Sequence, residues 1–328
     1  MNHVATKTLL VIVIVLLISI GIGVLIKGKH APLDALPLER RMEFPDGYIS
    51  PAKRIARTLT EDKPGMHPLA KIAQAATNYT SGVAALRSLP MELTSEQIDR
   101  LRDVLAMPHD PSMKISLIEY NSIRNDVADI LLRQPRFSPD LLFDFSDMFA
   151  DSTQDPVWRD YCLQMLASGW QNLTERKEDI DVEDARAVAV SVLKKAAETQ
   201  SRWAGTALLG LQSMIADEMS AVSKEDFAKL VIGLATNESA LEQNRITAVR
   251  LAGICELRDA CSVVRGIAQT GETETLRSVA IASLGEIGNE TDRLVLLSAM
   301  GETGNISYAA KRALSVLNRR LQEGGTIN

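Results

Sequence analysis

The feature that most constrains this chain is a segment repeated near its C-terminal end. Arg245–Gly253 has the sequence RITAVRLAG, and RSVAIASLG follows 32 positions later at Arg277–Gly285, with Arg, Ala and Gly in the same places. A third approximate copy lies around Tyr308–Leu314. Self-similarity at this period is typical of stacked structural units, none of which can bury its apolar face alone. The sequence therefore predicts an array of small repeated units.

The composition and local patterns favour helices in these units. Aromatic residues make up only 4% of the chain while hydrophobic residues reach 46%, so Leu, Ala, Val and Ile must form most of the core. Such residues suit close-packed helices, whereas strands favour β-branched and aromatic side chains. No stretch longer than a few residues alternates apolar and polar side chains as a half-buried strand does. The sequence therefore predicts an all-α fold.

Several helix starts can be recognised along the chain. The segments 95–107 and 184–198 each place apolar residues on one helical face. Asp110-Pro111 and Asp155-Pro156 are each expected to open a helix, with Asp as the cap and Pro where its missing N–H is harmless. Ser223–Asp226 resembles a capping box before another apolar face. These signals predict successive helices from residue 51 onward.

A long apolar run lies near the N-terminus. Leu9–Ile26 contains eighteen residues without a charge. As a helix this run would rise about 27 Å, close to the hydrocarbon thickness of a bilayer. Gly28–Ala31 is a poor signal-peptidase site, so we expect an uncleaved anchor rather than a removed signal peptide. We therefore predict a single-pass membrane protein with a transmembrane helix over residues 8–26.

The side of the membrane is open to two interpretations. More basic residues follow the apolar run than precede it, which favours a cytoplasmic domain by the positive-inside rule. They are Lys27, Lys29, Arg40 and Arg41, against Lys7 alone on the other side. In contrast, a short N-terminal tail followed at once by an apolar helix is typical of export of the downstream chain. Of the two, we expect an extracytoplasmic C-terminal domain.

The organisation follows from these signals and from a proline-containing segment after the apolar run. Three prolines and no sustained period mark residues 30–50 as part of a linker. The predicted parts are a tail (1–7), the anchor (8–26), the linker (27–50), divergent helical repeats (51–200), clearer repeats (201–322) and a C-terminal tail (323–328).

The repeat also resembles a known family. Leu276–Asn289 (LRSVAIASLGEIGN) is similar to a HEAT repeat of the bacterial kind related to bilin-lyase repeats. In that pattern a first helix with small residues ends at a Leu-Gly-x-Ile-Gly-Asn turn, and a second helix follows, here over about 291–300. The resemblance is good over 240–322, looser at Arg202–Gly210 and weak over 51–200. It implies a right-handed α-solenoid of HEAT-like helix pairs, which binds proteins along a face formed by the second helices, and it implies no reaction.

Two residue types recur at matching positions of the repeats. Arg202, Arg245 and Arg277 could form a ladder, which would either face a partner or brace adjacent repeats. Gly253 and Gly285 also recur, and we expect them to relieve crowding where their helices end.

The cysteines offer one further pattern. Cys255 is predicted at the end of one helix and Cys261 at the start of the next, across a short turn. The two sulfurs could reach bridging distance, so a disulfide is one interpretation and two thiols packed as small apolar groups are the other. Cys162 has no evident partner and is predicted to lie in the core.

Residues with the chemistry of an active site are scarce. The chain has four His residues, and no HExxH, GxSxG or phosphate-binding glycine motif. The acidic run 178–184 lacks the glycine of an EF-hand loop, so we interpret it as a solvated loop before a helix N-terminus. A net charge of −6 leaves no basic surface for nucleic acid. We expect no catalytic residue, cofactor, metal or nucleic-acid partner, and no small-molecule substrate is evident.

The sequence leaves three functional hypotheses. The favoured one is a membrane-anchored, non-enzymatic HEAT-repeat scaffold that mediates protein–protein interaction. The alternative is a structural subunit of a membrane or envelope complex that contacts its partners through the anchor helix over 8–26. A bilin-lyase-like enzyme or chaperone is least favoured, because the scarcity of His opposes it. No motif identifies the protein partner.

Overall fold

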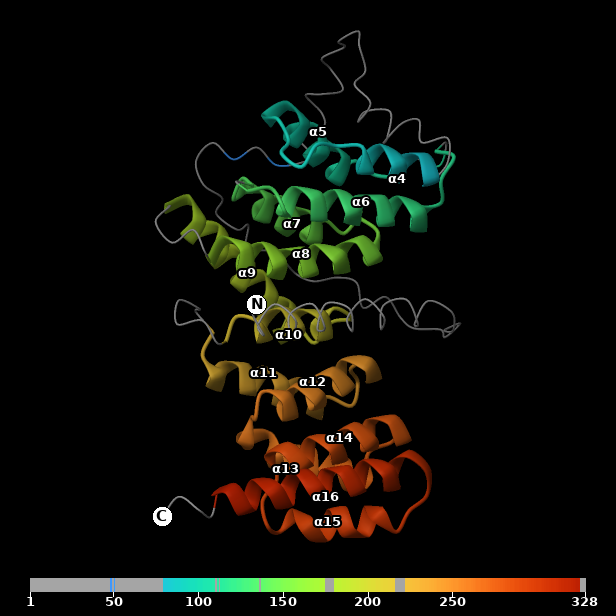
Figure 1. Ribbon diagram of the computed structural model, residues 1–328, viewed down its shortest axis with the longest axis vertical. Coiled ribbons are helices and arrows are strands. Elements are labelled where there is room, and N and C mark those ends of the chain that lie inside the picture. The colour runs from blue at the N-terminus through green and yellow to red at the C-terminus, as the bar shows by residue number, and fades with distance from the viewer. Residues whose placement is uncertain are drawn as a thin grey trace. The chain divides into compact units, whose positions relative to one another are not determined.

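The computed structural model describes Tyr48, Ser50 and residues 79–109, 111, 113–135, 137–174, 180–215 and 222–324. In these residues the chain forms thirteen α-helices, one short 3-10 helix (η1) and no strand (Figure 1). The predicted all-α class is therefore confirmed. The helices are α4 (Tyr79–Arg87), α5 (Ser95–Ala106), α6 (Leu117–Leu132), α7 (Asp140–Ala150), α8 (Pro156–Thr174), α9 (Ile180–Glu198), α10 (Ala204–Gln212), α11 (Lys224–Thr236), α12 (Glu242–Ile254), η1 (Arg258–Ala260), α13 (Cys261–Thr270), α14 (Glu274–Ile287), α15 (Asp292–Met300) and α16 (Gly304–Gly324).

Several predicted regions lie outside the described residues. These are the tail over 1–7, the anchor over 8–26 and nearly all of the linker over 27–50. Among the residues that are described, no helix is both long and apolar enough to cross a bilayer. The chain divides into two units, Met1–Ala35 and Leu36–Asn328, and every helix named above belongs to the second unit.

Local capping explains where several helices begin. The Asp155 carboxylate accepts from the Val157 and Trp158 backbone N–H groups and starts α8 as predicted. Ser223 caps α11 in the same way. The helix predicted to open at Pro111 begins later, at Leu117, because Ser116 forms a complete capping box there with Glu119.

Consecutive helices form six antiparallel hairpins. The pairs that pack together are α5–α6, α7–α8, α9–α10, α11–α12, α13–α14 and α15–α16. We call the first helix of each pair the first layer (α5, α7, α9, α11, α13, α15) and the second helix the second layer (α6, α8, α10, α12, α14, α16). Within each layer every helix packs against the helices of the adjacent hairpins, and α4 packs against α6 (Figure 1). In the described part of the chain, substantial helix packing joins only members of one hairpin or of adjacent hairpins.

The helix pairs in the structure differ from those that the HEAT resemblance predicts. The resemblance predicts that the Arg277 helix comes first in its pair and the helix over 291–300 second. In the structure α14 instead packs against α13, the helix before it, across the three-residue turn 271–273. α12 packs only slightly against α13, the helix after it, because the turn at 255–257 and η1 redirect the chain between them. The 291–300 helix, α15, is therefore the first member of the last hairpin.

Glycines allow the second-layer helices to approach closely. A Cβ on Gly253 of α12 would lie 2.9 Å from Ser283 Oγ and 3.0 Å from Ser283 Cα of α14. A Cβ on Gly285 of α14 would lie 2.8 Å from the backbone of Ala313 of α16. Because side chains do not tolerate such distances, the prediction that these glycines relieve crowding is confirmed.

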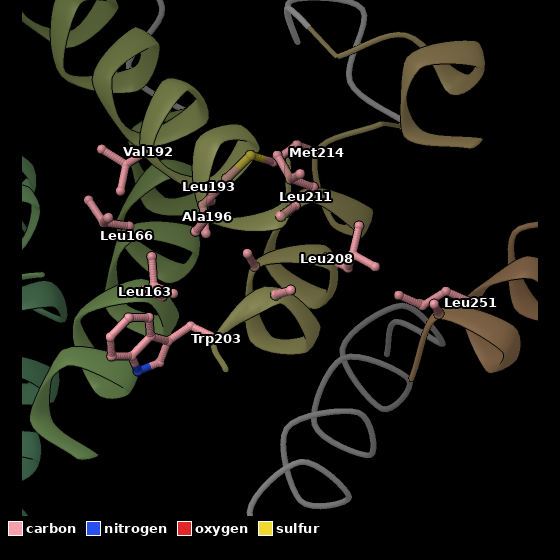
Figure 2. Close-up of a cluster of buried hydrophobic side chains, with 14 of the residues drawn as sticks. Leu163, Leu166, Val192, Leu193, Ala196, Trp203, Leu208, Leu211, Met214 and Leu251 are labelled. Carbon is pink, nitrogen blue, oxygen red and sulfur yellow. The ribbon is translucent and has the colours of Figure 1, made fainter. Parts of the chain in front are cut away.

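One connected cluster of buried apolar side chains extends from Leu86 to Leu317. Each hairpin therefore completes its core against its neighbours. Figure 2 shows the part of this cluster between α8, α9 and α10. The labelled residues there include Leu163, Leu166, Val192, Leu193, Ala196, Trp203, Leu208, Leu211 and Met214. Cys162, predicted to be a core residue, is fully buried in the cluster.

Candidate functional site: an arginine ladder

Arg277 connects the two helices of its own hairpin with the next hairpin. It lies in the first turn of α14, and its Nε donates to the Ala268 carbonyl oxygen near the end of α13 (3.4 Å). Its two terminal nitrogens donate to the Glu302 carboxylate in the turn between α15 and α16 (3.1 and 2.8 Å). A cation at the end of α13 also complements the partial negative charge of the helix dipole there.

Arg245 repeats this arrangement one hairpin earlier. Its Nε donates to the Ala235 carbonyl oxygen near the end of α11 (3.2 Å), and its Nη1 donates to Glu272 in the turn between α13 and α14 (2.7 Å). Glu272 and Glu302 are the central residues of the two Gly-Glu-Thr tripeptides at 271–273 and 301–303. The repeated tripeptide therefore supplies the carboxylate that the arginine of the preceding hairpin binds.

Two arginines that the sequence comparison missed occupy the same role earlier in the chain. Arg124 of α6 donates to a carbonyl near the end of α5 and to Gln154 in the turn before α8 (2.9 Å), and its guanidinium stacks on the Trp158 ring (4.0 Å). Arg159 of α8 donates to a carbonyl near the end of α7 (2.7 Å) and stacks on the Trp203 ring (4.2 Å). In these hairpins an indole takes the place of the glutamate, and cation–π attraction replaces part of the ion pair. We call Arg124, Arg159, Arg245 and Arg277 the arginine ladder.

Arg202 does not belong to this ladder. It lies before α10, is exposed, and has its guanidinium carbon 6.0 Å from the Trp203 ring. Arg159, Arg245 and Arg277 are each the fourth residue of their helix, and the fourth residue of α10 is Ala207.

The ladder is internal. Arg124, Arg159 and Arg245 are buried, and Arg277 is half-buried. Burial lowers the pKa of Arg124 to about 10, and this outweighs the opposing effect of Tyr120 and other neighbouring groups. The hydrogen bonds that Arg277 donates to Glu302 raise the pKa of Arg277, and the same contact lowers the pKa of Glu302. The ladder therefore stabilises the packing of adjacent hairpins. The guanidinium groups of its buried arginines are not exposed to a partner.

The last hairpin replaces the arginine by a shorter side chain. Ser307 lies at the fourth residue of α16, as Arg277 does in α14, and its hydroxyl donates to the Met300 carbonyl oxygen at the end of α15 (2.9 Å). Ser307 therefore makes the hydrogen bond to the end of the preceding helix within its own hairpin, and its side chain is too short to extend to another hairpin.

No protein-family model, no curated protein and no solved structure matches the chain.

Cys255 and Cys261 are free thiols in the structure. The ionisable groups around them differ. Burial raises the pKa of Cys255 to about 11, and Lys224 opposes this rise. Cys261 lies 3.6 Å from Asp292 Oδ2 and beside Arg265. Of the two interpretations that the spacing allowed, a disulfide and two separate thiols, the structure contains the two separate thiols.

Asp292 organises the surroundings of Cys261. Its carboxylate is fully buried and accepts from Nε and Nη2 of Arg265, and from the Asn289 backbone N–H (2.8 Å). Burial alone would raise the pKa of Asp292, but the hydrogen bonds from Arg265 and Asn289 lower it more, so the pKa lies below its ordinary value. This carboxylate links α13 to the start of α15, which are adjacent helices of the first layer. It therefore joins adjacent hairpins, as the arginine ladder does.

The remaining candidates are also part of the packing. Asp144 is 1% exposed and forms an ion pair with Arg102 (2.8 Å). His109 is half-buried against the Tyr120 ring, with the ring centroids 5.5 Å apart. Within the described residues no three His, Cys, Asp or Glu side chains are placed to hold a metal ion.

Proposed function

We propose that the chain is a membrane-tethered scaffold in which HEAT-like helix pairs form a right-handed α-solenoid that binds other proteins. The observation that carries this proposal is the arginine ladder, because it repeats one contact at four of the five junctions between adjacent hairpins. Two layers of helices in which each hairpin touches only its neighbours are the packing that solenoids have. The polar side chains of the ladder hold the hairpins in register, which suits a scaffold rather than a catalyst.

The partner surface in this proposal is the outward face of the first layer. This is the layer that contains the 291–300 helix, on which the sequence placed the binding ridge. Leu294 and Leu297 of α15 are 74% and 50% exposed and lie three residues apart, so they share one helical face. Exposed apolar anchors surrounded by polar residues are typical of protein-binding sites.

Crosslinking in intact cells, followed by identification of the captured protein, tests the proposal. The wild-type chain should capture a defined protein, and a Leu294→Asp/Leu297→Asp variant should lose most of it. Ile254→Asp is the matched control, since Ile254 is 55% exposed but belongs to α12 of the second layer. Equal capture by all three chains would contradict the proposed surface, and capture of nothing by the wild type would contradict the scaffold.

The tether itself is tested separately. Exchange of residues 8–26 for an unrelated membrane-spanning helix should leave capture intact if the helices after residue 50 bind the partner. Loss of capture would instead favour a structural subunit that makes its contacts through the anchor helix. Alkylation of Cys255 and Cys261 in intact cells by a membrane-impermeant reagent tests the proposed extracytoplasmic side, on which both thiols should be modified.

A further inference from the structure

The last helix of the second layer, α16, leaves one long face uncovered. In α12 and α14 the twelfth residue is a glycine that approaches the next helix of the layer closely, and the eighth residue lies one turn away on the same side of the helix. These residues are all buried, and they are Val249 and Gly253 in α12 and Ile281 and Gly285 in α14. The eighth and twelfth residues of α16 are Lys311 and Ser315, and both are exposed. The face on which a further helix would pack is therefore polar and open.

This open face is basic. Arg312 and Arg319 lie on it with Ser315, because steps of three, four and seven residues return to one side of a helix. Both arginines are exposed, and so is Tyr308, whose ring centroid lies 5.9 Å from the Arg312 guanidinium carbon. We call Tyr308, Lys311, Arg312, Ser315 and Arg319 the basic face.

The cations of the basic face have no acidic partner among the described residues. No described carboxylate lies within ion-pair distance of Lys311, Arg312 or Arg319. The fourth cation of α16, Arg320, donates instead to carbonyl oxygens at the end of α14. The net charge of −6, from which no basic surface was expected, averages over the whole chain and does not reveal this local excess of cations.

We propose that the basic face binds an acidic α-helix of a partner protein, which lies along α16 where a further second-layer helix would pack. Arg312 and Arg319 are seven residues apart, or about 10.5 Å along the helix axis. Two carboxylates two turns apart on a partner helix would face both guanidinium groups, and a guanidinium holds a carboxylate through two N–H groups. This site lies on the second layer and goes beyond the first-layer surface at Leu294 and Leu297.

The composition of the basic face favours an acidic helix over other anions. Helices that bind membranes bury large apolar side chains beside their cations, but Tyr308 is the one large apolar side chain of the basic face. The apolar side of α16 is already buried in the core. Nucleic-acid sites contact roughly six or more phosphates, whereas the basic face offers three cations. Because Ser315 replaces the glycine, a partner helix would lie farther from α16 than α14 does, which leaves room for long basic side chains.

Binding of a synthetic helical peptide to the full chain in non-ionic detergent tests the proposal. The probe has roughly 20 residues, mostly Ala and Gln, with two Glu residues seven positions apart. Fluorescence anisotropy should show that wild type binds this peptide and that salt weakens the binding. The variant Arg312→Glu/Arg319→Glu should bind about tenfold more weakly or less, because two attractive charge pairs become repulsive.

Two controls separate the site from net charge and from loss of folding. Arg250→Glu/Arg258→Glu makes the same change of net charge at exposed positions outside α16, and it should bind the peptide as wild type does. A peptide with Lys in place of both Glu residues should bind the Arg312→Glu/Arg319→Glu variant better than it binds wild type. That reversal requires a folded α16.

Three results would overturn the proposal. They are no binding of the acidic peptide to wild type, equal binding by wild type and Arg312→Glu/Arg319→Glu, and failure of the reversed peptide to prefer that variant. If phosphatidylserine added to the micelles protects Lys311 from acetylation while the peptide does not bind, the face belongs to a membrane instead. Leu294→Asp/Leu297→Asp should bind the peptide as wild type does, so the basic face and the first-layer surface can fail separately.

Discussion

At the residue scale, one arginine position links three structural elements. Its Nε caps the preceding helix, and its terminal nitrogens or its planar face reach the next hairpin. A lysine has no such planar fork and could not make both contacts from one position. The exposure of the guanidinium differs along the ladder, from a buried Arg245 to a half-buried Arg277. The free energy that each contributes should differ accordingly.

Arg245→Met should lower the free energy of unfolding by about 1–3 kcal/mol, because a buried carbonyl and Glu272 lose their donor. Arg277→Met should cost less, about 0.5–1 kcal/mol, since solvent already screens its pair with Glu302. Urea unfolding of the two variants checks the order. A larger loss for Arg277→Met would show that burial does not control the strength of the ladder.

Asp292 predicts a dependence of stability on pH. Its pKa is lowered in the fold, so it stabilises the fold above its ordinary pKa of 3.8, and this contribution is lost as the pH falls through the lowered value. Asp292→Asn should therefore be less stable by about 2 kcal/mol at pH 7. The difference from wild type should shrink below about pH 4. Asp259→Asn, at an exposed position, serves as the control, and an Asp292→Asn deficit that persists unchanged at pH 3 would contradict the assignment.

Two glycines should respond to alanine in opposite directions. Gly266 lies inside α13 with open space around its Cβ position, so Gly266→Ala should stabilise the fold by about 0.5–1 kcal/mol. Gly285→Ala should destabilise it by about 1–3 kcal/mol, because its Cβ would collide with the α16 backbone. Thermal unfolding of the pair measures both signs. Equal effects would mean that α14 and α16 are not as close as described.

At the scale of elements, the sequence predicted features that depend on neighbouring residues. The start of α8 was predictable because Asp155 caps it through backbone groups only a few residues away. The pairing of α13 with α14 was not, because packing and turn length decide it. The same holds for the ladder. Arg159 was missed because the repeat pattern is weak before residue 200, and Arg202 was included because its spacing alone does not reveal that α10 begins after it, at Ala204.

The end of α12 offers a test of one element boundary. Glu256 has a left-handed φ of 51°, and the Glu256 and Leu257 N–H groups donate to Gly253 and Ala252 as in a Schellman motif. Glycine adopts this conformation without strain, so Glu256→Gly should stabilise the fold by about 0.5–1 kcal/mol. Glu238→Gly, in the exposed turn after α11, is a control without the left-handed requirement. A loss of stability in the Glu256 variant would contradict the assigned helix end.

At the scale of the whole molecule, each hairpin among the described residues packs against the hairpins next to it. In such a stack the cost of a local change should spread to the adjacent hairpins and then fade. A globular core would distribute it to all helices. The ladder, the Asp292 contact and the glycine contacts all act between adjacent hairpins.

Hydrogen exchange of the Arg245→Met variant, followed by mass spectrometry, measures how far the effect of one lost ladder contact spreads. Exchange should be faster in α11–α14, on both sides of the substituted arginine, and unchanged from wild type in α5–α8. A uniform increase of exchange across α5–α16 would contradict it.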